Sequence, residues 1–296
     1  MNLELFIARR IAHNGSGNRP GVMVRIAVVA VALSVTVMIL ALAVIMGFKR
    51  EITDRVTGFS AQVEVADLRS AGSIESVPVL RSEQLERTIR SAGEVVRLAP
   101  YAVKGGVVKT PDAILGVMLK GVDGGYDWSF FRDHLLEGEL PRVGDSIRTK
   151  EILISRSVAR EMGLVPGDKV EMLFVESEKS PRRDRFKVSG IYATGMDEFD
   201  RSVAMTDLRN VQRLADWSSD EVSGYEVTLA DFSQAEDFSR RLNDMLLDSD
   251  REAFWDLTAR SAQERFPTVF DWLKTHDVNA AVILVIMVVV AVFNMA

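Results

Sequence analysis

Cysteine is absent from this chain of 296 residues, and histidine occurs only three times. No disulfide can therefore stabilise the fold, and no metal site can be built from thiolates. The histidines His13, His134 and His276 stand far apart in the chain, so we expect no shared metal site. The glycine-rich phosphate loop, the H-E-x-x-H zinc motif and the G-x-S-x-G nucleophile motif are also missing. The sequence thus predicts no catalytic residue and no bound cofactor.

Basic charge is in deficit, and the deficit is concentrated in the middle of the chain. The formal net charge is −6, but residues 49–277 hold 32 basic and 41 acidic residues, a local net charge of −9. A nucleic-acid surface needs a basic patch, so we expect no nucleic-acid partner.

Charge is missing altogether from two apolar runs near the ends of the chain. The run at residues 26–48 would extend about 34 Å as a helix, enough to cross a hydrocarbon core of about 30 Å. We predict a first transmembrane helix at residues 22–48; a cleaved signal peptide is the alternative, but the apolar run is too long for one. Residues 278–296 show no polar stripe, which favours a second span over a buried core helix. Because the run stops at the last residue, we expect this span to be incomplete.

Charges before the first span predict its orientation. Four arginines oppose one acidic residue there, which places the N-terminus in the cytoplasm and residues 49–277 on the far side of the membrane. Residues 1–21 are predicted to form a cytoplasmic interfacial helix and a turn, with a merely solvated leader as the alternative.

The acidic segment at residues 49–277 alternates between strand and helix patterns. We predict a membrane protein in which transmembrane helices flank a large extracytoplasmic α+β domain of two lobes, the second at roughly residues 138–215. Within it, residues 151–164 predict a strand and a short helix ended by Gly163. Ser233 and Glu236 have the spacing of a capping box at the start of another helix.

One basic stretch stands out within the acidic segment. Residues 175–186, "VESEKSPRRDRF", are predicted to be a loop between two strands. Exposed loops with concentrated charge are candidates for partner docking, whereas a solvated hairpin tip is the alternative. The candidate docking residues are Lys179, Pro181, Arg182, Arg183 and Arg185.

Several stretches together carry a family likeness that covers nearly all of the chain. They are "FIARR" near the start, "VIMGF" at the end of the first apolar run, "EILISRSVAREMGLVPGDKVEM", "FKVSGIYATGMDEFDRSVAMTDLRNVQRL" and "VFDWLKTHDVNAAVILVIMVVVAVFNM". They resemble the permease subunits of lipoprotein-releasing ABC transporters (the LolC/LolE type), within the wider MacB/FtsX-like permease superfamily. The last two stretches are the most specific.

The resemblance implies a four-span permease in the bacterial inner membrane, with its large domain in the periplasm. Transmembrane helices 3 and 4 are then absent from this chain, together with the cytoplasmic loop that would couple it to an ATPase. The chain itself would be non-catalytic, and ATP would be bound and hydrolysed by a separate LolD-like ABC ATPase subunit. With a second permease copy or a sister permease, it would extract lipoproteins from the outer leaflet and pass them to a LolA-like periplasmic carrier.

The resemblance also implies roles for particular residues. Apolar side chains of the two spans would contact the acyl chains of the lipoprotein, although packing between the spans is an equally good role; they are Met38, Leu42, Met46, Phe48, Val290 and Phe293. The family's carrier-docking element lies where this chain has its basic stretch. A related permease that exports another amphiphile or regulates a periplasmic partner is the main alternative, and a two-span sensor or anchored enzyme is a third.

Overall fold

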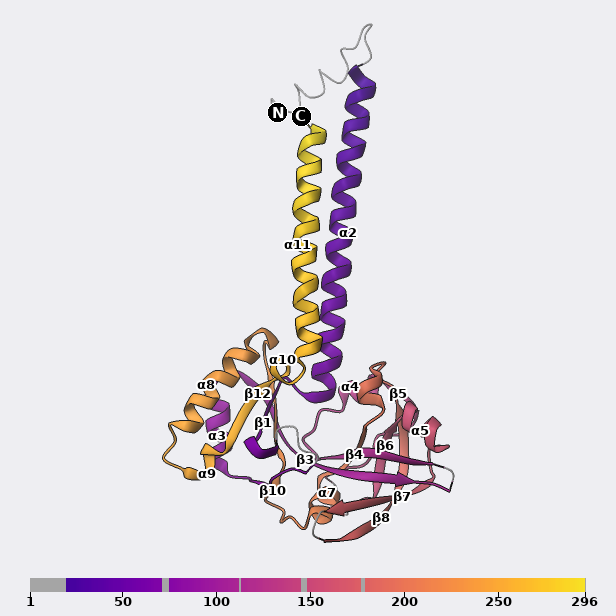
Figure 1. The fold of residues 1–296 in the computed structure, drawn as a ribbon, viewed down its shortest axis with the longest axis vertical. Helices are drawn as coiled ribbons and strands as arrows, with labels where there is room; N and C mark the ends of the chain where they lie inside the picture. The colour runs from indigo at the N-terminus through magenta and orange to yellow at the C-terminus, as the bar shows by residue number, and fades with distance from the viewer. Residues whose placement is uncertain (1–19, 71–74, 112, 145–147, 177–178, 296) are drawn as a thin grey trace. The chain divides into compact units, whose positions relative to one another are not determined.

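The computed structural model describes residues 20–70, 75–111, 113–144, 148–176 and 179–295 (Figure 1). The chain divides into two compact units. The first comprises residues 1–53 and 267–296, and the second comprises residues 54–266. The interfacial helix predicted at residues 1–21 lies almost entirely outside the described residues.

Two long helices, α2 (Pro20–Ser60) and α11 (Pro267–Met295), form the described part of the first unit. They lie side by side and run in opposite directions (Figure 1), with the rings of Phe48 and Trp272 5.5 Å apart. Pro267 occupies the first helical position of α11, where its missing N–H leaves no hydrogen bond unmade. The helix α2 continues beyond Phe48, and its last turns belong to the second unit.

The helix α2 has the composition of a membrane span. Among the described residues, Val28–Ser60 is the one helical stretch long and apolar enough to cross a bilayer. Its Ser34 and Thr36 hydroxyls donate to the carbonyl oxygens of Ala30 and Ala32, at 2.9 and 2.8 Å, so no hydroxyl hydrogen is left without an acceptor in an apolar surrounding. In α11 the apolar stretch is the shorter Ala281–Val290, so the second predicted span stays a prediction.

A ten-stranded sheet runs through the second unit, in the order β12-β1-β11-β3-β4-β9-β6-β8-β5. The strand β7 pairs with both β3 and β8, which closes β3, β4, β9, β6, β8 and β7 into a hydrogen-bonded ring. Within the ring β4–β9 and β6–β8 are parallel pairs and the other pairs are antiparallel. The strands are β1 (Val63–Asp67), β3 (Val95–Lys109), β4 (Ile114–Val122), β5 (Leu135–Gly138), β6 (Glu151–Ser155), β7 (Lys169–Glu176), β8 (Lys179–Tyr192), β9 (Val203–Asp207), β11 (Gly224–Leu229) and β12 (Leu257–Ser261). A separate pair is formed by β2 (Val79–Leu80) and β10 (Glu221–Val222).

Helices cover the sheet and one of its edges (Figure 1). The helix α8 lies against β12, where the Asn243 side chain donates to the Ala259 carbonyl oxygen and accepts from the Ala259 N–H. This pair of hydrogen bonds satisfies backbone groups at the sheet's β12 edge, which could otherwise pair with another chain. The helices of the unit are α3 (Glu83–Ser91), α4 (Ser129–Asp133), α5 (Arg156–Met162), α6 (Asp197–Asp200), α7 (Leu208–Ala215), α8 (Ala235–Leu247), α9 (Glu252–Trp255) and α10 (Ala262–Arg265), with 3-10 turns η1 (Leu68–Ser70) and η2 (Phe232–Gln234).

Local predictions for this unit had mixed outcomes. The predicted strand and helix at residues 151–164 are confirmed as β6 and α5, and Gly163 ends α5 with a φ of 65°. The capping box predicted at Ser233 is wrong, because Asp231 caps η2 and α8 begins only at Ala235 without a side-chain cap. A capping box does form at Ser261, at the start of α10. The predicted lobe boundaries stay a prediction, since one sheet runs through the whole unit.

Two apolar cores lie within the second unit. The larger core packs α3, α7 and α8 against the sheet. The smaller one contains Phe59 from the last turn of α2, surrounded by Phe131, Tyr192 and Met205 among others. The end of α2 is therefore part of this unit's interior.

Candidate functional site

The predicted acyl-contact residues lie on the two helices of the first unit. Met38 and Leu42 are half-buried, whereas Met46 and Phe48 are exposed, Met46 by 63%. Val290 is also exposed, and the side chain of Phe293 lies outside the described residues. Both helices thus present apolar side chains on their surface, and contact of these side chains with acyl chains stays a prediction.

The predicted basic loop is instead a β-hairpin. The strands β7 and β8 pair as far as Glu176 and Lys179, so the docking residues are part of β8. Because side chains alternate across a strand, they divide into two sets. Arg183 and Arg185 face outward and are exposed, while Arg182 lies on the same side as the buried Asp184.

Arg182 and Asp184, on the inward side of β8, form ion pairs with other parts of the second unit. Arg182 contacts the carboxylate of Asp216 and donates to the Arg213 carbonyl oxygen at 3.2 Å. Lys150 and Arg213 both contact Asp184. Burial acts to raise the pKa of Asp184, but these hydrogen bonds outweigh it and hold the pKa below its usual value. Of the three arginines, Arg183 and Arg185 are therefore the two whose side chains face solvent, and the docking role stays a prediction.

Sequence analysis did not find a second charged region, which lies at the end of α2. Its apolar part is the last turn of α2, where Val56 and Phe59 are buried. The Phe59 ring lies 4.7 Å from that of Phe199 and 6.0 Å from that of Phe131. The preceding Gly58 is required for this packing, because a Cβ at that position would lie 2.3 Å from the Phe130 ring.

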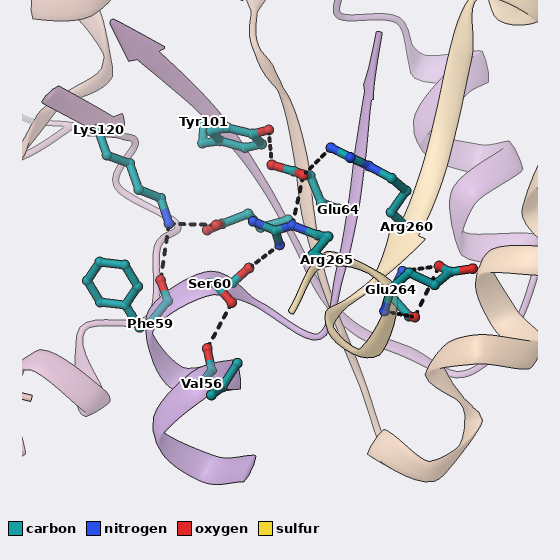
Figure 2. A network of polar contacts seen from close by, with 11 residues as sticks. Val56, Phe59, Ser60, Glu64, Tyr101, Lys120, Arg260, Glu264 and Arg265 are labelled. Atoms are coloured by element: carbon teal, nitrogen blue, oxygen red, sulfur yellow. Dashed lines mark hydrogen bonds and ion pairs between the residues drawn. The ribbon is translucent and has the colours of Figure 1, made fainter. Parts of the chain in front are cut away.

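Six polar side chains lie next to the end of this turn and pair with one another, and we call them the junction cluster (Figure 2). The sheet register places three of them side by side, because Glu64 of β1 pairs with Glu226 of β11 on one side and with Arg260 of β12 on the other. Two carboxylates directly opposite each other repel, so the arrangement requires nearby cations. The cluster consists of Glu64, Tyr101, Lys120, Glu226, Arg260 and Arg265.

The cations of the junction cluster pair with both carboxylates. Lys120 Nζ lies 2.5 Å from a carboxylate oxygen of Glu226, and Arg265 Nε lies 3.0 Å from one of Glu64. Arg260 lies 3.4 Å from the same Glu64 oxygen, and the Tyr101 hydroxyl donates to the other. All these groups are at most one-third exposed, so solvent screens them little.

The pKa values of the cluster follow from this pairing. Burial acts to raise the pKa of Glu64, but Arg265, the Tyr101 hydrogen bond, Arg260 and Lys120 together lower it below its ordinary value of 4.5. Burial and the Glu64 carboxylate raise the pKa of Tyr101 well above its ordinary value. Glu64 is therefore charged and Tyr101 neutral at physiological pH.

The same cations hold the C-terminus of α2. Ala61 leaves the helix with a φ of 61°, and the last carbonyl groups of α2 then need other donors. Arg265 donates to the Ser60 carbonyl oxygen at 2.7 Å, and Lys120 lies 3.5 Å from that of Phe59 (Figure 2). Positive charge at this position also complements the negative end of the helix dipole.

A cavity of about 330 Å³ opens beside the junction cluster, between its charged side chains and the rings of Phe59, Phe199 and Phe266. No group of three or more His, Asp or Glu side chains suited to a metal ion occurs among the described residues. The cluster can therefore position a helix end by charge, but the described part of the chain offers no metal centre.

Comparison with known proteins gives a family. The family of MacB-like periplasmic core domains matches residues 26–245, more than half of the chain. The chain belongs to this family.

Three curated relatives carry the name "Lipoprotein-releasing system transmembrane protein LolC". Those from two strains of Xylella fastidiosa are 27% and 26% identical to this chain, over 269 and 267 residues, and that from Neisseria meningitidis serogroup B is 24% identical over 262 residues. Each match covers 86% of this chain, which spans 59% of the relative's length. The predicted likeness to LolC-type permeases of the MacB/FtsX-like superfamily is confirmed.

Solved structures with similarity to the chain include two transporter domains. One is the extracellular domain of the noncanonic ABC-type transporter YknZ from Gram-positive bacteria, with a TM-score of 0.43 and 15% identity, covering 68% of this chain and 100% of that one. The other is the periplasmic region of MacB from Actinobacillus actinomycetemcomitans, with a TM-score of 0.46 and 13% identity, covering 70% of this chain and 92% of that one.

Proposed function

We propose that this chain is a non-catalytic permease subunit of an ATP-driven ABC transporter that extracts lipoproteins from the outer leaflet of the bacterial inner membrane. The observation that carries the proposal is the match to lipoprotein-releasing proteins over 86% of the chain. The membership of the MacB-like periplasmic family and the apolar length of α2 support it. The chain is a multi-pass inner-membrane protein in this proposal, with residues 49–277 in the periplasm.

Energy for the extraction comes from a partner. A separate ABC ATPase subunit binds and hydrolyses ATP, and a second permease copy or a sister permease completes the membrane part. Each buried CH₂ of an acyl chain contributes about 0.8 kcal/mol to membrane anchoring, so extraction needs both an energy source and another apolar surface. The exposed apolar side chains of α2 and α11, Met46 and Phe48 among them, provide that surface.

Delivery to a periplasmic carrier uses the β7–β8 hairpin in this proposal. The outward set, Arg183 and Arg185, is 71% and 75% exposed and lies 3.7 Å from Glu171. Guanidinium groups held this loosely can exchange their partner for a carboxylate of the carrier. Arg182 instead supports the hairpin through Asp216.

Site-specific photocrosslinking tests the proposal. A photoreactive amino acid at Met46 or Phe48, in the transporter assembled with its ATPase, should capture lipoprotein. Leu247 is the matched control, because it is apolar and 63% exposed but lies on α8 of the second unit. Crosslinking of a periplasmic protein to the second unit, with no lipoprotein crosslinked to α2, would overturn the proposal. It would support the alternative permease that regulates a periplasmic partner.

A further inference from the structure

The end of α2 is held on several sides within the second unit. Besides the buried Val56 and Phe59, the Arg55 guanidinium donates to the Thr194 carbonyl oxygen at 2.9 Å. Lys120 and Arg265 approach the last carbonyl groups, as described above. The last two turns of α2 are thus bound by a core, a loop after β8, the strand β4 and the helix α10.

Arg265 links three parts of the chain at one point. Its guanidinium contacts the Ser60 carbonyl oxygen at the end of α2 and the Glu64 carboxylate of β1. Its own backbone ends α10, and Pro267 opens α11 two residues later. One side chain therefore joins the end of one apolar helix, the sheet and the residues that lead into the other apolar helix.

The junction cluster contributes less to the free energy of folding than its number of ion pairs suggests. Removing charges from water is costly, and well-packed apolar side chains of similar volume would stabilise the site equally well or better. Charged hydrogen bonds differ from apolar contacts in that they are directional and strong only in one geometry. Such a cluster can therefore maintain one orientation of the helix end under load, whereas an apolar contact can slide.

We propose that Arg265 and Lys120 are positioning residues that clamp the end of α2 to the sheet, so that displacement of α2 passes to the domain. This inference rests on the proposed function, in which ATP hydrolysis moves the membrane helices. Without the clamp, the last turns of α2 shift against the sheet and the displacement is lost at the connection.

The first test needs neither cargo nor ATPase. The chain contains no cysteine, so spin labels can be attached to an Asp54→Cys, Ile114→Cys pair, both positions lying within residues 54–266. The distance distribution between the labels in the full chain should be single and narrow, and Arg265→Met should broaden it. Arg265→Lys should recover part of the narrow component, because it keeps the charge but loses the second contact.

Arg240→Met is the matched control for this measurement, because it removes an exposed ion pair with Asp237 in the same unit. It should leave the distribution unchanged. Distributions for Arg265→Met and Lys120→Met as narrow as that of the original chain would overturn the clamp.

The second test measures coupling in the assembled transporter in liposomes. Arg265→Met should lower the lipoprotein released per ATP hydrolysed by about tenfold while ATP hydrolysis continues, a size typical of coupling between sites. If Arg265→Met lowers lipoprotein release and ATP hydrolysis equally, or lowers neither, a positioning role is contradicted. If the original chain releases no lipoprotein, the proposed function fails, and the distance measurement still decides the clamp.

Discussion

The junction cluster and the β7–β8 hairpin are two charged regions with opposite designs. In the cluster, Lys120 and Glu226 are 8% and 9% exposed and lie 2.5 Å apart. On the hairpin, Arg183 and Arg185 are largely exposed and lie 3.7 Å from their acidic partner. Solvent and salt screen the hairpin pairs but reach the cluster poorly. The difference teaches that burial, rather than the density of charge along the sequence, decides which charged groups are held in close pairs and which stay accessible to solvent.

Breaking one buried pair should have the largest effect. Lys120→Met leaves the Glu226 carboxylate buried without its cation and should lower the free energy of unfolding by about 3–5 kcal/mol. Urea unfolding of the full chain in detergent measures it. The double variant Lys120→Met, Glu226→Leu should recover most of the loss, because no unpaired charge remains. If the single variant lowers the free energy of unfolding by less than about 1 kcal/mol, the buried pair contributes no more than an exposed surface ion pair.

The aromatic anchor of α2 should come next. Phe59→Ala removes a buried ring from the smaller core and should cost about 3 kcal/mol in the same unfolding experiment. Phe48→Ala is the control on the same helix, because Phe48 is 47% exposed, and we expect it to cost less than about 1 kcal/mol. Equal costs would show that Phe59 does not anchor the helix end.

Helices and strands could be predicted from the sequence more completely than the junction cluster could. The apolar helix α2 could be predicted because 23 consecutive residues lack charge, a property that depends on no other part of the chain. The cluster was not, because Glu64, Lys120 and Glu226 meet only through strand register. Their one local signal was a charged residue between buried apolar neighbours, as in "VEV", "MLKGV" and "YEVTL".

The hairpin error has a different physical cause. Proline and several arginines in a row are typical of loops, which favoured a loop at residues 175–186. The alternation of outward Arg183 and Arg185 with buried Asp184 and Phe186 is instead the two-residue period of a strand. That period was present in the sequence, but charge density concealed it.

Acidification should weaken the cluster to a smaller extent. The pKa of Glu64 lies below its ordinary value of 4.5, so its contribution to stability is complete above about pH 4.5 and is lost as the pH falls through the lowered pKa. Glu64→Gln should therefore flatten the fall in unfolding free energy below pH 4.5, measured by urea unfolding across that range. An unchanged pH dependence in this variant would argue against the cause assigned to the shift.

The smallest effect on stability should come from the hairpin. Replacing Arg183 and Arg185 by serine should change the free energy of unfolding by less than about 1 kcal/mol, since both ion pairs are exposed. Binding of the periplasmic carrier should weaken and lose much of its salt dependence, which titration at two salt concentrations measures. Unaltered carrier binding would remove the outward set from the docking surface.

Membrane topology is the claim on which the whole account depends, and the absence of cysteine allows it to be tested with single labels. Leu80, in the second unit, is 65% exposed, and Val44, on α2, is 62% exposed. Each can be replaced by a single cysteine. A membrane-impermeant maleimide added outside an intact inner membrane should label the Leu80→Cys variant and spare the Val44→Cys variant. Protection of Leu80→Cys until the membrane is permeabilised would contradict the account.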